Sequence, residues 1–437
     1  MEDKVWSCDA GSFIGYESSG CFQITGIRYA TAERYGRPVP YRYPEGTHEC
    51  REPCPFCVQD EARIEGRLVG IYYQDYPQSE DCLRLSITVP DDVTPDSLLP
   101  VMVWYHGGAY KNGGCETYLY ERTRLVGEEK VVMVSVNYRV GMLGFVRDIS
   151  GDLSNNGILD SIEGLRWVKR NISAFGGDPD NITIFGQSAG ADIIRCIMLS
   201  EGTEDLYKRA IMQSPPLGVV TGREGMDRQL LEELNRYPVD ISAKELIEAQ
   251  GTILSKIKVK GNIKEMPFGP HHGVYPLPKA EEIPSRLKEI SKGHTLLIGC
   301  NRKEVVAYVG ADPKLIRLYR NPLTGWLVRR IVQKKSDDIF RNGTREFAHL
   351  YAECGGDTYL YDFHWREEML LGSCHGFELP LLFGADGYDE NSEIASGMRI
   401  SEINEIGRSF RRMWADFARD GSMKVMSLSG IIDVEHL

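Results

Sequence analysis

A tight turn between a strand and a helix, in residues 181–191, constrains the fold of this chain more than any other segment. The run reads as a short apolar strand, a turn that carries Ser188, and a helix that begins near Ala189. Gly186 and Gly190 complete the pattern Gly-x-Ser-x-Gly, which is typical of a strained strand-to-helix turn that presents a serine. The glycines are needed because backbone passes so close to the turn that a Cβ would clash. The N–H groups at the start of the helix then point at any anion formed beside Ser188.

Near-continuous apolar runs of strand length occur along the chain, and such runs indicate parallel strands covered on both faces. Segments with a helical pattern, such as residues 162–170, lie between them. This alternation predicts an α/β fold with a doubly wound, mostly parallel sheet. Residues 11–30 alternate apolar and polar side chains between glycines, which predicts an antiparallel hairpin. The other expected strands are residues 83–89, 101–105, 131–136, 182–185, 210–212, 295–298 and 358–363.

The domain organisation follows from where this alternation is interrupted. The whole chain, residues 1–437, is expected to form one domain, because α/β enzymes of this length often fold as one unit. Residues 219–292 and 311–350 are rich in charge and contain helical patterns. We expect both to be small helical cap insertions over the carboxyl edge of the sheet, where ligands bind in open α/β folds.

The charge and hydropathy of the chain limit its partners. The net charge of −12 argues against a nucleic-acid partner and against binding to an anionic membrane. No apolar run reaches the roughly 18 residues of a transmembrane helix. The first residues lack the basic and apolar regions of a signal peptide. A soluble, cytoplasmic protein is therefore predicted, and its oligomeric state stays unknown.

Five motifs resemble, in order, those of the type-B carboxylesterases, the α/β-hydrolase family that includes the cholinesterases. They are residues 79–83, 100–110, 137–141, 175–190 and 373–380. The resemblance extends over roughly residues 13–421. It implies an α/β-hydrolase fold and a serine esterase that acts on a small-molecule ester and needs neither metal nor cofactor.

The resemblance also implies a catalytic triad of Ser188, Glu304 and His375. A serine hydroxyl is a poor nucleophile until a base removes its proton, and a third group must orient that base. The order serine, acid, histidine along the chain is the order found in α/β hydrolases. His364 competes for the role of base, but it ends an alternating strand and is expected to be a packed or surface histidine. Val305 follows Glu304, where the family usually has glycine.

Residues 106–109 resemble the glycine-rich oxyanion loop of the same family. By that alignment, the backbone N–H groups of Gly108, Ala109 and Ala189 are expected to stabilise the oxyanion of the tetrahedral intermediate. The alternative is a tight turn that requires glycine for its conformation alone.

Four further residues are expected near the site, and Ser214 stands at a family position of its own. Ser214 and Glu378 are expected to lie close to the reacting groups without touching the substrate. Arg139 and Asp160 occupy positions that form a buried ion pair in the family.

The cysteines leave three alternatives open. Cys50, Cys54 and Cys57 have the spacing of the iron–sulfur ligands in radical enzymes that use S-adenosylmethionine. Their loop is rich in proline and charge, and the chain that follows resembles an esterase. The resemblance implies a disulfide between Cys82 and either Cys54 or Cys57, whereas the missing signal peptide favours reduced thiols. Free thiols, one such disulfide and a metal site are therefore all considered.

The predicted activity is hydrolysis of carboxylic esters through an acyl-enzyme. The alternatives are a catalytically silent binding protein on the hydrolase fold and an iron–sulfur radical enzyme. Amides, carbamates, lactones and thioesters also stay open as substrates, because the same triad serves them all and the fold does not choose. The acyl and alcohol groups of the substrate are not predicted.

Overall fold

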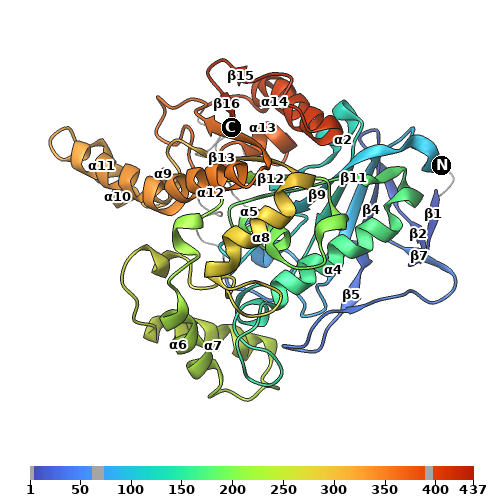
Figure 1. Ribbon diagram of the computed structural model, residues 1–437, viewed down its shortest axis with the longest axis horizontal. Coiled ribbons are helices and arrows are strands. Elements are labelled where there is room, and N and C mark those ends of the chain that lie inside the picture. Colours follow the sequence, from blue (N-terminus) through green and yellow to red (C-terminus); the bar gives the residue numbers. More distant parts are fainter. Residues whose placement is uncertain (1–3, 62–72, 389–396) are drawn as a thin grey trace.

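The computed structural model describes residues 4–61, 73–388 and 397–437, and a sheet of eleven strands forms the centre of these residues (Figure 1). From one edge to the other, its strands are β15 (Ser427–Leu428), β16 (Ile432–His436), β14 (Asp357–Phe363), β13 (Thr295–Asn301), β12 (Arg209–Gln213), β11 (Gly177–Gln187), β9 (Leu99–Tyr105), β10 (Val132–Val136), β8 (Arg84–Pro90), β4 (Cys21–Arg28) and β3 (Tyr16–Ser18).

The middle of this sheet is parallel, from β14 through β13, β12, β11 and β9 to β10. Antiparallel strands flank it, with β8, β4 and β3 on one side and β16 and β15 on the other. The prediction of a mostly parallel sheet is confirmed. Because the parallel strands end at one edge, the loops that follow β9, β11, β13 and β14 are brought together there.

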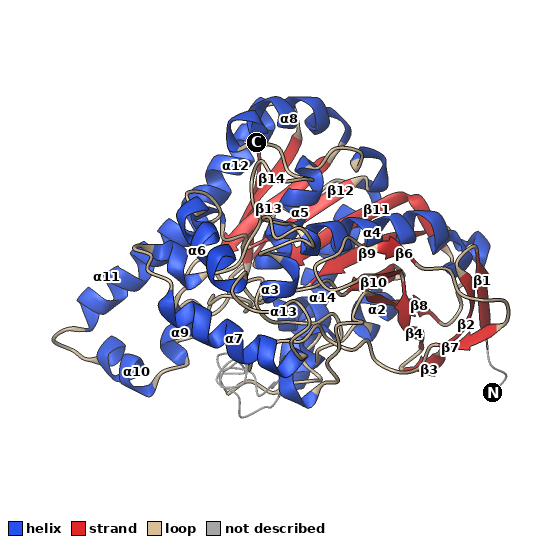
Figure 2. Ribbon diagram, turned by 90° about the horizontal axis from the view of Figure 1, so that it is seen from below, coloured by secondary structure: helices blue, strands red, loops and turns tan. Residues whose placement is uncertain are grey.

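Helices cover both faces of the sheet (Figure 2). In β9, Val101 and Val103 belong to one apolar core and Met102 and Trp104 to the other, as alternation along a strand requires. The helices that pack into the first core include α4 (Asn156–Asn171), α5 (Ala189–Leu199), α8 (Ile283–Ile290) and α12 (Asn342–Glu353). The helices that pack into the second core include α2 (Thr123–Glu129), α13 (Leu379–Phe383) and α14 (Ile400–Asp420).

The hairpin predicted for residues 11–30 is only half right. β3 and β4 do pair antiparallel, but β2 (Gly11–Ile14) lies in a separate sheet with β1 (Val5–Cys8) and β7 (Thr47–Glu49). A Cβ at Gly15 would lie 2.3 Å from the carbonyl oxygen of Gln23, so the chain passes close to β4 where it changes sheets. The two short strands β5 (Ala30–Thr31) and β6 (Val39–Pro40) pair with each other.

Several helices lie beside the sheet instead of on its faces. α6 (Glu224–Leu234) and α7 (Ala243–Lys256) pack against each other, and α3 (Gly141–Gly144) is a single turn. α9 (Val306–Gly310) leads into α10 (Pro313–Arg320) and α11 (Gly325–Ser336), which form a hairpin that projects from the body at the left of Figure 1. A π-helical turn, Asp337–Arg341, connects α11 to α12. The charged segment 219–292 thus ends near α8 and the charged segment 311–350 ends within α12, and both helices belong to the core.

Throughout the described ranges, no helix is both long enough and apolar enough to cross a lipid bilayer.

Candidate active site

Ser188 lies in a strained turn between β11 and α5. Its backbone has φ 58° and ψ −125°, a combination that non-glycine residues rarely adopt. The N–H of Ser188 donates to the carbonyl oxygen of Gln213 at 2.8 Å, which holds the turn against the end of β12. The predicted strand, turn and helix are therefore all present, and α5 begins at Ala189.

The glycines on both sides of Ser188 are required by the end of β9. A Cβ on Gly190 would lie 2.0 Å from the carbonyl oxygen of Tyr105, and a Cβ on Gly186 would lie 2.7 Å from that same atom. Backbone atoms cannot yield to such contacts at low cost. Both positions therefore exclude any side chain, as the pattern in the sequence indicated.

The structure brings His375 and Glu304 together. His375 follows β14, Glu304 follows β13, and Nδ1 of His375 lies 2.5 Å from Oε2 of Glu304. The Glu304 side chain is fully buried, and its Oε1 accepts a hydrogen bond from the backbone N–H of Asn301 at 2.7 Å. Because a carboxylate can only accept, Nδ1 of His375 carries the proton and Nε2 is left with a lone pair.

Nε2 of His375 is next to Gln187, a residue that the sequence analysis did not select. The two Nε2 atoms are 3.1 Å apart, so the amide N–H of Gln187 donates to the imidazole lone pair. The position of Gln187, directly before Ser188, was the only signal in the sequence that could have identified it.

The competing histidine, His364, contacts other groups. Its Nδ1 lies 3.2 Å from the carbonyl oxygen of Asp362 and 3.8 Å from Oδ2 of Asp433, and the ring is mostly buried. It caps the end of β14 beside the terminal strands, as expected of a packed histidine.

A second buried carboxyl group, Glu378, lies behind Glu304. It accepts hydrogen bonds from Nδ2 of Asn301 at 2.6 Å and from Nε2 of Gln213 at 3.3 Å. Burial, and then the negative charge of Glu304, raises the pKa of Glu378 to about 7. Asn301 thus contacts both carboxyl groups, through its backbone N–H and its side chain. Asn301 was missed because an asparagine at a strand end has many ordinary roles.

Ser214 directly follows β12. Its backbone φ is 50°, and its N–H donates to the carbonyl oxygen of Gly299 at 2.8 Å. The hydroxyl is buried and has no hydrogen-bond partner in the part of the chain that the structure describes.

The glycine-rich loop after β9 lies against the turn of Ser188. A Cβ on Gly107 would lie 3.1 Å from the Cβ of Ser188. Gly108, Ala109 and Tyr110 have φ values of 113°, 53° and 59°, so three consecutive residues are in the left-handed region. This conformation favours glycine and is costly for Ala109 and Tyr110, and such strain is common at functional sites.

Tyr110 ties this loop to the helix that follows Ser188. Its buried hydroxyl donates to Oδ2 of Asp192, in the first turn of α5, at 2.6 Å. Oδ1 of Asp192 accepts from Nε of Arg195 at 2.5 Å, and both of these side chains are buried. Sequence analysis missed the pair, because an acidic residue in the first turn of a helix usually serves only the helix dipole.

His106 supports the same loop from its other end. Burial lowers the pKa of His106 to about 4, so the ring is neutral near pH 7. Its Nδ1–H donates to the carbonyl oxygen of Gly107 at 2.8 Å, and the ring stacks on Tyr138 with centroids 4.3 Å apart. The hydroxyl of Tyr138 donates to the carbonyl oxygen of His106 at 2.6 Å.

The predicted ion pair between Arg139 and Asp160 is present. Nη2 and Nε of Arg139 each lie 2.7 Å from an oxygen of Asp160, and both side chains are buried. A bidentate pair of this kind also fixes the backbone, because Asp160 accepts from the N–H of Arg139 at 3.1 Å.

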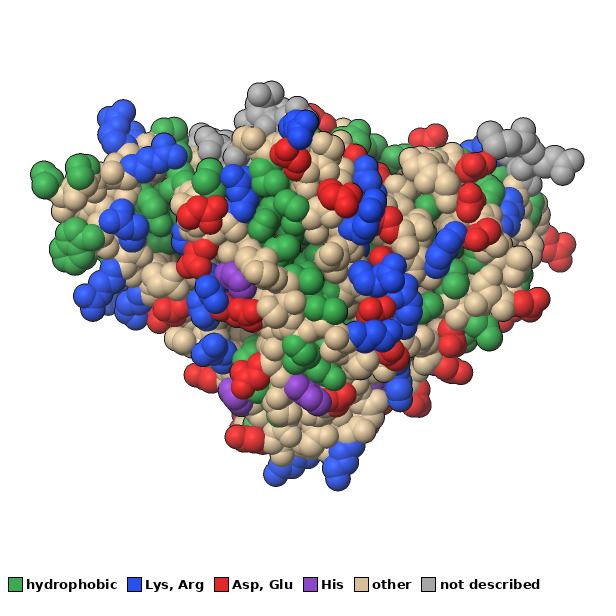
Figure 3. Space-filling model, turned by 90° about the horizontal axis from the view of Figure 1, so that it is seen from above, with side chains coloured by type: hydrophobic (Ala, Val, Ile, Leu, Met, Phe, Trp, Pro, Cys, Tyr) green, Lys and Arg blue, Asp and Glu red, His purple; other side chains and the backbone are tan. Residues whose placement is uncertain are grey.

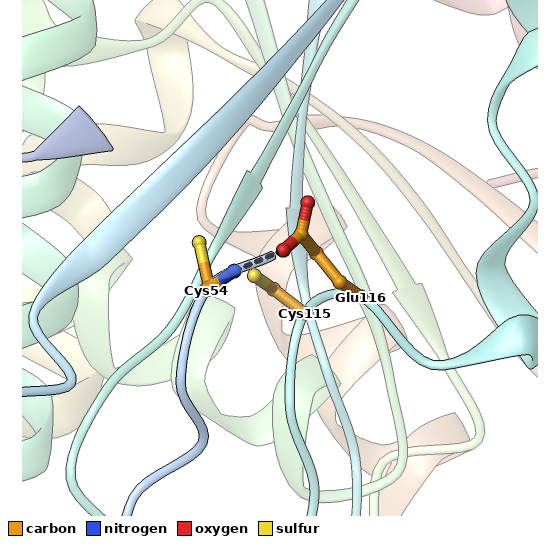
Figure 4. Close-up of side chains that lie close together, drawn as sticks. All are labelled: Cys54, Cys115 and Glu116. Atoms are coloured by element: carbon orange, nitrogen blue, oxygen red, sulfur yellow. Dashed lines mark hydrogen bonds between the residues drawn. The ribbon is translucent and has the colours of Figure 1, made fainter. Parts of the chain in front are cut away.

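The three cysteines with iron–sulfur spacing do not form one ligand group. All eleven cysteines are free, including Cys82, whose pKa is raised well above its ordinary value by a hydrogen bond with Cys57 and by burial. The possible ligand atoms that do converge, in the described part of the chain, belong to Cys54, Cys115 and Glu116 and lie within 4.8 Å of one another (Figure 4).

The groups around Glu116 bear on whether this cluster could hold a metal. Glu116 accepts a hydrogen bond from the backbone N–H of Cys54, drawn as the dashed line in Figure 4. Its other oxygen lies 3.4 Å from Nη1 of the buried Arg122. A metal cation here would be repelled by the guanidinium and would compete for a carboxylate that is already paired. The donor set therefore fits a hydrogen-bonded thiol pair better than a metal site.

The chain is similar to known proteins in both sequence and structure. Residues 10–318 match the carboxylesterase family. A probable N-octanoylanthranilate hydrolase of Rhodococcus erythropolis is 34% identical over 405 residues, which cover 91% of this chain and 88% of that protein. A para-nitrobenzyl esterase of Bacillus subtilis (strain 168) is 28% identical over 460 residues, or 97% of this chain and 91% of that protein. The solved structure of a thermophilic PNB esterase superposes with a TM-score of 0.79 and 26% identity, covering 100% of this chain and 98% of that one.

Proposed function

Because the chain belongs to the carboxylesterase family and has the α/β-hydrolase fold, we propose that it uses Ser188, His375 and Glu304 as a catalytic triad. Membership of this family makes the protein a carboxylic ester hydrolase, so the alternatives of a silent binding protein and an iron–sulfur enzyme are set aside. The observation that carries the triad is the 2.5 Å contact between Nδ1 of His375 and the buried Oε2 of Glu304.

In the first half of the proposed reaction, Oγ of Ser188 attacks the ester carbonyl carbon. Its proton passes to Nε2 of His375, and Glu304 stabilises the resulting imidazolium through Nδ1–H. The carbonyl π electrons move to oxygen, and the bond to the alcohol breaks as His375 returns the proton to the leaving oxygen. An acyl-enzyme remains on Ser188, and water then repeats the same steps to release the acid.

For Ser188 to reach Nε2 of His375, the amide of Gln187 has to give up its hydrogen bond to that nitrogen. Hydrogen bonds of catalytic groups are often poorly aligned before substrate binds, so this rearrangement is compatible with the role of base. The exchange is local, because Gln187 and Ser188 are adjacent in the chain.

We propose that the oxyanion is stabilised by the backbone N–H groups of Gly108, Ala109 and Ala189. The support is geometric, since the loop of Gly108 and Ala109 packs on Ser188 and Ala189 begins α5. Donors held in place before the reaction need no reorganisation when negative charge develops. Tyr110 and Asp192 hold the loop to α5, and His106 holds Gly107, so the donors are fixed from two sides.

The remaining assignments concern the surroundings of the triad, the domain organisation and the location of the protein. Glu378 and Ser214 are proposed to position the triad through the strand ends, without touching substrate. We propose one domain in which residues 219–292 and 311–350 are insertions, and a cytoplasmic location, for which eleven free thiols are the support.

A second substrate class is favoured by one relative. The Rhodococcus protein is named a probable N-octanoylanthranilate hydrolase, and that compound contains an amide. Aryl amides with a medium-length acyl chain therefore belong in any substrate panel beside chromogenic esters.

The test is ester hydrolysis by matched variants. His375→Ala should lower kcat by several orders of magnitude, and Glu304→Ala should lower it somewhat less. The kcat of His364→Ala should stay near that of wild type. A double variant of His375 and Glu304 should fall little below His375→Ala alone, because the groups act as a unit. Equal losses for His364→Ala and His375→Ala would contradict the assignment of the base.

A further inference from the structure

The hairpin formed by α10 and α11 is unlike the rest of the surface. Residues 313–336 contain seven lysines and arginines and no acidic residue, in a chain with a net charge of −12. All other residues together therefore carry −12 − 7 = −19. The net charge predicted no membrane partner, but it averages over the surface and conceals this local positive segment.

The same hairpin exposes large apolar side chains. No residue of α10 is buried, and α11 buries only Gly325 and Ser336. Leu323, at the tip, is 82% exposed and Trp326 is 58% exposed. The other exposed apolar side chains here are Leu315, Leu318, Leu327 and Ile331. At the left end of the molecule in Figure 3, where the hairpin lies, apolar and basic side chains stand together.

Most basic side chains of the hairpin are not engaged in ion pairs with described residues. Lys334 and Lys335 pair with Asp338 and Glu265, at 2.8 and 3.0 Å. Lys314, Arg317, Arg320 and Arg330 make no ion pair with any residue that the structure describes. Ile316, Tyr319 and Val332 pack toward the second core, so the hairpin is anchored by one face and presents the other.

We propose that this hairpin docks the protein on an anionic lipid surface. Basic residues beside exposed leucine, isoleucine and tryptophan are the composition of helices that lie in the membrane interface, where apolar side chains enter the headgroup region. Each lysine or arginine near an anionic leaflet adds attraction. A second copy of the hairpin fits poorly, because it would place seven positive charges against seven. The projecting shape in Figures 1 and 2 suits insertion into a soft surface.

The base of the hairpin lies beside the proposed triad. The N–H of Val305, which follows Glu304, donates to Oγ of Ser336 at 3.0 Å, and the ring of Phe340 lies 4.7 Å from that of His375. Docking would therefore bring the site close to esters dissolved in lipid. This consequence rests on the proposed triad, whereas docking itself does not.

Tryptophan fluorescence gives a direct test. Trp326 is the one exposed tryptophan of the six in the chain, all of which are described. Wild-type protein should show a blue-shifted emission with vesicles of phosphatidylcholine and phosphatidylglycerol, and none with phosphatidylcholine alone. High salt should reverse the shift, because it screens the attraction. An unchanged spectrum with anionic vesicles would overturn the proposal.

Vesicle flotation of matched variants assigns the surface. Arg317→Glu with Arg330→Glu should lower the partition coefficient by roughly tenfold or more, and Trp326→Ser should also lower it. The controls, Lys244→Glu with Arg408→Glu and Ile149→Ser, change exposed residues elsewhere and should bind as wild type does. Equal losses in the controls would overturn the assignment. Loss of a dimer in the hairpin variants, with no vesicle binding by wild type, would instead identify an interface between copies.

Because binding is measured without ester turnover, its failure leaves the triad untouched. Conversely, an inactive but vesicle-binding protein would contradict the proposed function and support the docking surface.

Discussion

The side-chain amide of Gln187 lies 3.1 Å from Nε2 of His375, the ring nitrogen opposite the one that contacts Glu304. Gln187 therefore holds the atom that Ser188 has to reach. A charge at this position would act directly on the base.

We predict that Gln187→Glu shifts the acidic limb of the kcat/KM profile to higher pH. A carboxylate beside Nε2 favours the imidazolium, so the base stays protonated, and inactive, until a higher pH is reached. The measurement is a pH–rate profile against Gln229→Glu, which makes the same change at a half-buried position of α6. An acidic limb that stays in place or moves to lower pH would show that Gln187 does not contact the base.

Glu378 gives a prediction for stability against pH. Its pKa is about 7 in the folded protein and near 4.5 in the unfolded chain, so between these values the folded state holds the extra proton. Wild type should therefore lose stability as pH rises from 5 to 8, relative to Glu378→Gln, by about 2–3 kcal/mol. Urea unfolding of both proteins at the two pH values measures this difference. A constant difference would mean that Glu378 titrates normally.

The contact between Tyr110 and Asp192 predicts a positioning role. Tyr110→Phe removes a buried hydrogen bond, which should lower the free energy of unfolding by about 1–3 kcal/mol. The variant also loosens the loop of Ala109, which should lower kcat by up to roughly 10²-fold with a smaller change in KM. The control is Tyr105→Phe, since the Tyr105 hydroxyl is equally buried but donates to the carbonyl oxygen of Ser161. If Tyr110→Phe and Tyr105→Phe lost the same stability and had the same kcat, Tyr110 would have no positioning role.

The cysteines should bind no iron–sulfur cluster. Purified protein is expected to lack broad visible absorbance and stoichiometric iron. The reasons are that the Cys50, Cys54 and Cys57 thiols do not converge, and that the Cys54 thiol is hydrogen-bonded to the Cys115 thiol beside Arg122. Metal analysis and an absorbance spectrum of anaerobically purified protein decide the point. Iron that is lost in Cys54→Ala and retained in Cys196→Ala would contradict it.

The sequence predicted the parts of the fold that depend on local pattern. The apolar run of β9 is predictable because the strand is buried on both faces. The glycines around Ser188 are predictable because the turn has no room for side chains. The edge strands β15 and β16 were missed, since they are short and partly exposed.

Contacts between distant segments were not predictable. Gln187 and Asp192 carry no pattern of their own, and their partners, His375 and Tyr110, are fixed only when the loops at the sheet edge meet. The basic hairpin was visible as a charged segment, but its exposed tryptophan and leucines became apparent only with the fold. Positive φ at Ala109 was equally hidden, and it excludes proline there as a clean probe of the N–H donor.

The most direct test of the proposed triad is labelling with a fluorophosphonate probe followed by peptide mass spectrometry. Phosphonylation should occur on Ser188 alone, with loss of esterase activity, because only this serine lies in the strained turn beside the loop of Gly107. Ser188→Ala should neither react nor hydrolyse ester. An adduct on another serine, or esterase activity that persists in folded Ser188→Ala, would contradict the account.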